Sequence, residues 1–144
     1  MIKKLLLLVV SIGVIGGIVY LVPFVMALYL TDTEIQEINF PGYNEKLYLR
    51  NEKRGLNYEV TAIMTSPKKK ISGEKNRSLV YANGGTLFYK TTKDTLFVYT
   101  MLEAENPKAL ETNVIIKQIV ISNLKFIELN KEHDKIGLRK FPVN

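Results

Sequence analysis

Residues 86–100 read TLFYKTTKDTLFVYT, and this stretch decides the fold. Residue types that are enriched in strands lie on both sides of the polar pair Lys93-Asp94. Two residues are the length of a tight hairpin turn. We therefore predict an antiparallel hairpin in which residues 86–92 pair with residues 95–102.

This hairpin has two different faces. A turn at Lys93-Asp94 predicts that Tyr89 faces Val98 and that Phe88 faces Tyr99. One face then carries Leu87, Tyr89, Leu96 and Val98, and the other carries Phe88, Lys90, Phe97 and Tyr99. Aromatic residues in strands most often stabilise by packing, which favours a structural role for the second face. Its four residues are still the best candidates for a binding surface, because aromatics beside a cation are typical of interface hot spots.

Further strands are predicted on the N-terminal side of the hairpin. Residues 78–82 precede Asn83-Gly84-Gly85, whose Asn-Gly pair is preferred in tight turns, so residues 78–102 are expected to form a three-stranded meander. Residues 46–50 and 56–66 flank a polar connection that ends in glycine, which indicates a second hairpin.

The C-terminal side is less regular. Residues 113–122 are rich in isoleucine and valine on both faces, which predicts a central, doubly covered strand. Residues 124–129 are expected to form another strand, and residues 130–144 a loose polar tail. Residues 31–45 are a lead-in segment, either a short capped helix or a strand. Residues 46–129 are thus expected to form an antiparallel β-sandwich or a partly open barrel.

The first thirty residues indicate a membrane anchor. Lys3 and Lys4 precede an uncharged run from Leu5 to Leu30, which would span about 39 Å as a helix, more than the hydrocarbon core of a bilayer. A signal peptide with cleavage after Ala27 is the alternative, although its apolar region would be shorter than this run. The anchor is therefore favoured.

The charges at the ends of the run predict its orientation. Lysines beside a membrane segment stay on the cytoplasmic side, so residues 31–144 would lie outside the cytoplasmic membrane, in a periplasm or extracellular space. Gly13 and Gly17 form a G-x-x-x-G pair through which two helices could associate as a weak homodimer.

Composition narrows the function classes. The chain has no cysteine and a net charge of +6, which includes Lys3 and Lys4. The exported part must fold by packing without disulfides. Its basic run, residues 68–70, lies in a polar loop, and nucleic acid is not an expected partner outside a membrane.

Catalytic signatures are weak in this sequence. The single histidine, His133, lies in a charged stretch, and its neighbours Glu132 and Asp134 point in divergent directions, so no metal site is expected. Glu103 and Glu105 lie beside Asn106-Pro107, which indicates a solvated loop. No catalytic residue and no cofactor is expected, and an enzyme is not the favoured class.

These patterns predict a single-pass, membrane-anchored envelope protein that is not an enzyme. Its exported β domain is expected to contact another envelope protein, as an accessory subunit or an immunity-type inhibitor. The alternative is an exported β-sandwich that binds a small apolar molecule or a glycan through its aromatic strands.

Overall fold

The structure is a computed structural model that describes residues 17–23, 25, 31–41, 43–55, 58–68, 71, 78–82, 85–105 and 110–143. The elements are β1 (Thr31–Phe40), β2 (Tyr43–Arg54), β3 (Tyr58–Met64), β4 (Leu79–Ala82), β5 (Leu87–Thr91), β6 (Thr95–Thr100), β7 (Ile115–Val120), helix α2 (Asn123–Glu132), the 3-10 helix η2 (His133–Ile136) and β8 (Arg139–Phe141). The described chain is mainly β, as predicted.

Most of the predicted membrane run, residues 5–30, lies outside the described residues, as does Gly13. Residues 17–23 are helical. Within the described ranges, no helix has both the length and the apolar character needed to cross a bilayer.

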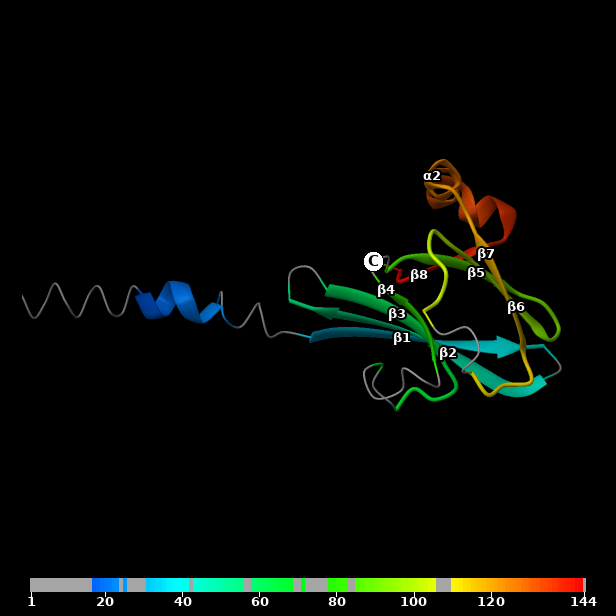
Figure 1. The fold of residues 1–144 in the computed structure, drawn as a ribbon, viewed down its shortest axis with the longest axis horizontal. Helices are drawn as coiled ribbons and strands as arrows, with labels where there is room; N and C mark the ends of the chain where they lie inside the picture. Colours follow the sequence, from blue (N-terminus) through cyan, green and yellow to red (C-terminus); the bar gives the residue numbers. More distant parts are fainter. Residues whose placement is uncertain are drawn as a thin grey trace, which may run out of the picture.

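The strands form two small sheets (Figure 1). One has the order β1-β2-β3-β4 and the other β7-β6-β5-β8. Neighbouring strands are antiparallel except β6 and β7, which are parallel. Neither sheet closes into a barrel within the described part of the chain.

The hairpin that decides the fold has the predicted register. Tyr89 pairs with Val98 and Phe88 with Tyr99, and the Thr92 amide donates to the Thr95 carbonyl at 2.9 Å across the turn. The two predicted faces are confirmed as well. Leu87, Tyr89, Leu96 and Val98 are all buried in one cluster that includes side chains of both sheets.

The core has three parts, one between the sheets and one on each outer face. The central cluster joins Ile38, Leu47 and Ile63 of the first sheet to the inner face of the hairpin. Ile71 covers the outer face of β3 and β4. On the outer face of the second sheet, α2 and the segment after it cover Phe88. Both sheets are thus covered on both sides over part of their area.

The predicted three-stranded meander is wrong. β4 pairs with β3 in the first sheet, whereas β5 and β6 belong to the second sheet. Residues 83–85 therefore connect two sheets rather than two neighbouring strands; Asn83 and Gly84 themselves lie outside the described residues. The strand 79–82 was correctly placed, but its partner is set by β3, which is distant in sequence.

The strand at 113–122 differs from its predicted role. β7 is an edge strand of its sheet and runs parallel to β6. The connection explains the direction, because it leaves the sheet before β7 begins: the Glu105 amide donates to the Val80 carbonyl of β4 at 2.9 Å, and the Asn113 amide donates to Glu45 at 3.0 Å. A chain that crosses to the other sheet and returns enters β7 in the direction of β6.

The C-terminal predictions are also wrong. Residues 124–129 belong to α2, whose first turn is capped by Ser122, since its hydroxyl accepts from the Lys125 amide at 3.3 Å. Residues 130–144 contain the end of α2, then η2 and β8, in place of a loose tail. Phe141 of β8 is 0% exposed and pairs with Leu87. For residues 31–45, the strand is the correct one of the two predicted alternatives: β1 occupies Thr31–Phe40, and β2 begins at Tyr43.

Candidate functional site

Phe88 is the one predicted site residue that lies fully inside the protein. It is 0% exposed, and its ring meets the ring of Phe126 edge-on at 5.3 Å between centroids. The ring of His133 lies 5.6 Å away on the same side. Helix α2 therefore covers Phe88, and this residue contributes packing rather than accessible surface.

Tyr99 shares that environment in part. It is half-buried and packs against the cluster formed by Phe88, Leu129 and Leu138. Of the three aromatic residues of the predicted face, Phe88 and Tyr99 thus belong to the cluster under α2, whereas Phe97 is half-buried and lies outside that cluster.

Phe97 lies between two lysines. Lys90 of β5 and Lys117 of β7 are its register neighbours on either side, so the three residues form one row across the sheet. The Lys90 Nζ is 5.4 Å and the Lys117 Nζ 5.5 Å from the centroid of the Phe97 ring. Both distances allow a cation–π interaction. The structure therefore joins Lys90 and Phe97, as predicted, and adds Lys117.

The two lysines have no carboxylate partner within the part of the chain that the structure describes. Lys140 of β8 adds a further cation on the same face, as the register neighbour of Phe88. The row around Phe97 is a positively charged surface with an aromatic ring at its centre, which suits a negatively charged group.

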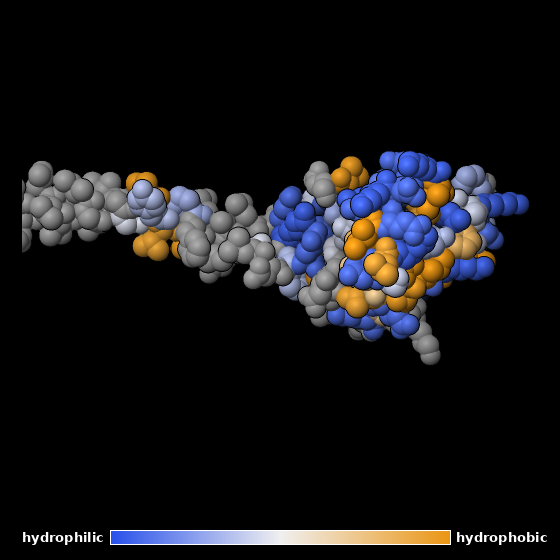
Figure 2. Space-filling view, turned by 90° about the horizontal axis from the view of Figure 1, so that it is seen from above, coloured by the Kyte–Doolittle hydropathy of each residue, from blue (hydrophilic) through white to orange (hydrophobic). Residues whose placement is uncertain are grey.

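The edge strand β7 exposes apolar side chains beside this row. Ile115 is 49% and Val120 50% exposed, and the helix that follows exposes Leu124 and Ile127. The view onto the α2 side has hydrophobic patches among hydrophilic ones (Figure 2). Exposed edge strands of β-branched residues are prone to pair with another chain. We define the β7 face as the outer surface formed by Lys90, Phe97, Ile115 and Lys117; Val120 lies on the opposite side of the strand, at the same open edge.

Lys117 was missed by sequence analysis. Its interaction with Phe97 depends on the parallel pairing of β6 and β7, which are separated by a long connection. In the sequence Lys117 directly follows Ile115 and Ile116, but nothing local indicates that it reaches the hairpin.

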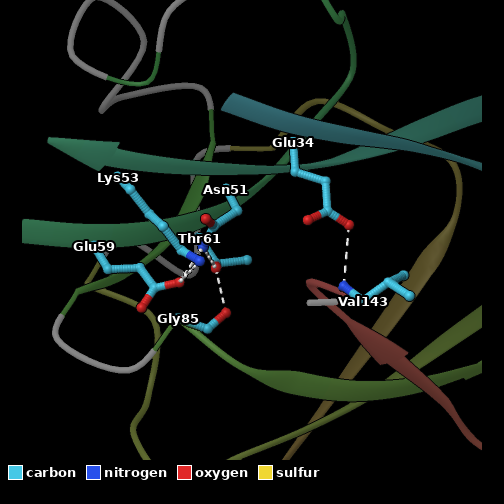
Figure 3. A network of polar contacts seen from close by, with 7 residues as sticks. All are labelled: Glu34, Asn51, Lys53, Glu59, Thr61, Gly85 and Val143. Atoms are coloured by element: carbon cyan, nitrogen blue, oxygen red, sulfur yellow. Dashed lines mark hydrogen bonds and ion pairs between the residues drawn. The ribbon is translucent and has the colours of Figure 1, made fainter. Parts of the chain in front are cut away.

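A second polar arrangement lies between the sheets, near the start of β1 (Figure 3). The Asn51 amide donates to Glu59 at 3.1 Å and to Thr61 at 2.9 Å, and the Thr61 hydroxyl donates to the Gly85 carbonyl. The Lys53 Nζ lies 3.7 Å from Glu59. These bonds attach the segment that enters β5 to the first sheet, which is a structural role.

Glu34, in the same row of the first sheet, contacts the C-terminal segment. It accepts a hydrogen bond from the Val143 amide at 3.0 Å, which attaches the C-terminal segment to β1. The row formed by Glu34, Asn51, Thr61 and Tyr81 crosses the first sheet from β1 to β4. Burial raises the pKa of the Tyr81 hydroxyl, which makes no hydrogen bond within the described part of the chain.

The groups considered for catalysis are dispersed. His133 lies against Phe88 and 3.5 Å from Asp134, whose side chain is 89% exposed. Glu103 and Glu105 are exposed. The described residues include no group of three or more potential metal ligands.

The chain was also compared with known proteins. No protein-family model, no curated protein and no solved structure matches it.

Proposed function

We propose that this chain is a single-pass, membrane-anchored envelope protein that acts by contacting another protein and is not an enzyme. Its N-terminus lies in the cytoplasm, residues 5–30 anchor it, and the β domain, a small sandwich, lies outside the cytoplasmic membrane. The contact surface is the β7 face, and the role is that of an accessory subunit or an immunity-type inhibitor.

One observation carries the proposed contact. β7 is an edge strand whose residues are mostly β-branched and apolar, and Ile115 and Val120 are each about half exposed. β1, one of the two edge strands of the other sheet, has Asp32, Glu34 and Glu37 along its length. Charged residues protect sheet edges from pairing with other chains, whereas an apolar edge favours it. The contrast between β7 and β1 supports β7 as the contact strand.

The proposed surface modifies the one expected from sequence. Phe88 lies under α2 and Tyr99 is half-buried, so a partner would meet Lys90 and Phe97 of the original four residues. An aromatic ring flanked by cations remains the residue combination typical of interface hot spots. Because α2 covers Phe88, the small-ligand alternative has less aromatic surface available to it than the sequence indicated.

The membrane part of the proposal rests on sequence. The uncharged run of residues 5–30 is long enough to span a bilayer, and Lys3 and Lys4 favour a cytoplasmic N-terminus. Protease added outside intact cells or spheroplasts should digest residues 31–144, and mass spectrometry should find the N-terminal run in the membrane-bound protein. Protection of the domain would contradict the orientation, and a soluble chain that begins at Leu28 would contradict the anchor.

Photo-crosslinking in the native membrane tests the contact. A photoreactive residue at position 115 or 120 of the full-length protein should give a discrete crosslink to another protein. Ile35 provides a matched control, because it is an edge-strand isoleucine of similar exposure, 44%, on the other sheet. Crosslinks from positions 115 and 120 that are no more frequent than those from position 35 would contradict the proposed contact surface.

A further inference from the structure

We infer that the partner contributes an extended segment with the pattern apolar–any–acidic–any–apolar, which pairs with the open edge of β7. This inference rests on the proposed function and specifies the partner's chemistry. It follows from three properties of β7: which backbone groups point outward, which side chains lie on the outer face, and which charges lack partners.

The backbone of β7 offers hydrogen-bonding groups along its open edge. The Ile115 amide donates to the Asp94 carbonyl at 2.9 Å, and the Ile121 amide donates to the Thr100 carbonyl at 2.8 Å. Odd-numbered residues of this strand thus point their backbone groups toward β6. The groups of the alternate residues, Ile116 and Gln118 among them, point away from β6, and β7 is the last strand of its sheet among the described residues. An added strand can pair with them.

The side chains of β7 specify what an added strand should carry. Ile115, Lys117 and Ile119 are alternate residues and lie on the same outer face as Phe97. A strand paired beside β7 places one side chain next to each of them. Apolar residues fit beside the two isoleucines, and an acidic residue fits beside Lys117. The resulting pattern is symmetric, so it holds for a parallel and for an antiparallel partner.

Charge favours an acidic residue at the centre. Lys117 and Lys90 flank Phe97 without a carboxylate partner among the described side chains. On β1, by contrast, Glu37 is already paired with Lys46 at 2.6 Å. An acid next to Lys117 forms the direct cross-strand pair, while Lys90, two strands farther away, adds only longer-range attraction.

A second copy of this chain is a poor source of the segment. The full sequence matches the pattern at one place, Tyr43–Leu47. That stretch belongs to β2, where it pairs with β1, and its Glu45 already accepts a hydrogen bond from the Asn113 amide. The occupant is therefore a segment of a different protein.

The site is also placed for a protein rather than for the surface of the anchoring membrane. β1 begins at Thr31, directly after the proposed anchor, and the β5–β6 turn lies at the opposite end of the β domain (Figure 1). The row of Lys90, Phe97 and Lys117 is close to that turn, because Thr95 pairs with Ile115 at the start of β7.

A selection from displayed random heptapeptides tests the inference, with the full-length protein in nanodiscs as bait. Wild-type bait should enrich peptides with an Asp or Glu flanked at two residues' distance by apolar residues. The Lys117→Glu bait should enrich Lys or Arg at the central position instead. Lys125→Glu on α2 is the control, because Lys125 lies outside the β7 face, and it should enrich the wild-type pattern.

Binding of an enriched peptide should show two things: the contribution of its acidic residue to affinity, and protection of the β7 amides that an added strand would pair with. Replacing its acid with the matching amide should weaken binding to the wild type by about two- to fivefold, the range of one cross-strand charge pair. Hydrogen exchange at the amides of Gln118 and Val120 should slow on binding, whereas exchange at Ile35 should not change.

The outcomes separate this inference from the proposed function. A selection that enriches no common pattern, or whose central preference is unchanged by Lys117→Glu, overturns the inference. Peptides that protect the β7 amides without an acidic residue also overturn it, while leaving protein contact through β7 intact. Protein contact through β7 is contradicted by the photo-crosslinking result at positions 115 and 120 and not by the outcome of the peptide selection.

Discussion

The carboxylate of Glu59 lies where a β-carbon on residue 85 would be placed, so Gly85 and Glu59 share one space between the sheets. Glu59 uses this space to accept a hydrogen bond from Asn51 at 3.1 Å, and the Gly85 carbonyl accepts from Thr61 (Figure 3). Glycine is needed here because of this close approach. The absence of a side chain at Gly85 therefore lets the segment that enters the second sheet lie close against Glu59 and Thr61 of the first sheet.

Gly85→Ala is expected to destabilise the protein by about 1 kcal/mol, the typical value of one hydrogen bond. The Glu59 side chain can swing toward solvent to avoid the new methyl group, but it then loses its bond to Asn51. Chemical denaturation of the detergent-solubilised full chain measures the change. In a Glu59→Ala background the cost of Gly85→Ala should largely disappear, and equal costs in the two backgrounds would show that the pair is not coupled.

Phe88→Ala and Phe97→Ala should differ in their effect on stability. Phe88 is 0% exposed beneath α2, so its truncation should cost about 3 to 5 kcal/mol. Phe97 is half-buried and flanked by two lysines, so its truncation should cost clearly less than that of Phe88 and should weaken partner capture. Denaturation curves of both variants decide this. Equal, large losses would assign Phe97 to the core and remove it from the β7 face.

Phe141→Ala tests the structural role of the C-terminal segment. Phe141 is 0% exposed and pairs with Leu87, which predicts a loss of about 3 to 5 kcal/mol. Val143→Ala is the matched control, because Val143 is 69% exposed and contacts Glu34 through its backbone amide. It should change stability by less than about 0.5 kcal/mol. A Phe141 variant as stable as the wild type would support a loose tail after all.

Tyr81→Phe should make the protein less sensitive to alkaline pH. Burial raises the pKa of the Tyr81 hydroxyl above its ordinary value of 10.0. Above pH 10 the unfolded chain ionises this group while the folded protein keeps it neutral, so stability is lost as the pH rises. The variant lacks this contribution. Between pH 8 and pH 11 the free energy of unfolding should therefore decrease less in the variant than in the wild type. An equal decrease in both proteins would exclude Tyr81 as the source of the alkaline sensitivity.

At neutral pH the same variant reports on the hydroxyl itself. The Tyr81 hydroxyl is buried and makes no hydrogen bond within the described residues. Removing such a hydroxyl breaks no hydrogen bond, and it also removes the free-energy cost of burying a polar group. We expect Tyr81→Phe to be neutral or stabilising at pH 7, and a loss above about 1 kcal/mol would indicate a partner for this hydroxyl.

The local pattern around Lys93-Asp94 was sufficient to predict the central hairpin. Its register, its turn and its two faces agree with the structure, because a two-residue turn fixes which residues lie opposite each other and strand alternation fixes the faces. The same reasoning identified Lys90 and Phe97 as neighbours. It also recognised strand-forming residues at 79–82 and 115–120.

The partners of those strands depended on the tertiary structure. The sequence of residues 115–120 is compatible with a central or an edge strand, and only the course of the long connection makes β7 an edge parallel to β6. That pairing brings Lys117 to Phe97 and creates the β7 face. Long-range pairing of this kind leaves no local periodicity from which it could be predicted.

The C-terminal region shows the same division between sequence and structure. Residues 124–129 contain enough apolar residues for a strand or a helix, and short apolar runs do not distinguish the two by periodicity alone. The outer face of the hairpin decides the matter, because Phe88 requires a cover and α2 supplies Phe126 and Leu129. The sequence by itself determined the hairpin and its faces; tertiary packing determined which face stayed open, because burial depends on contacts between segments far apart in the chain.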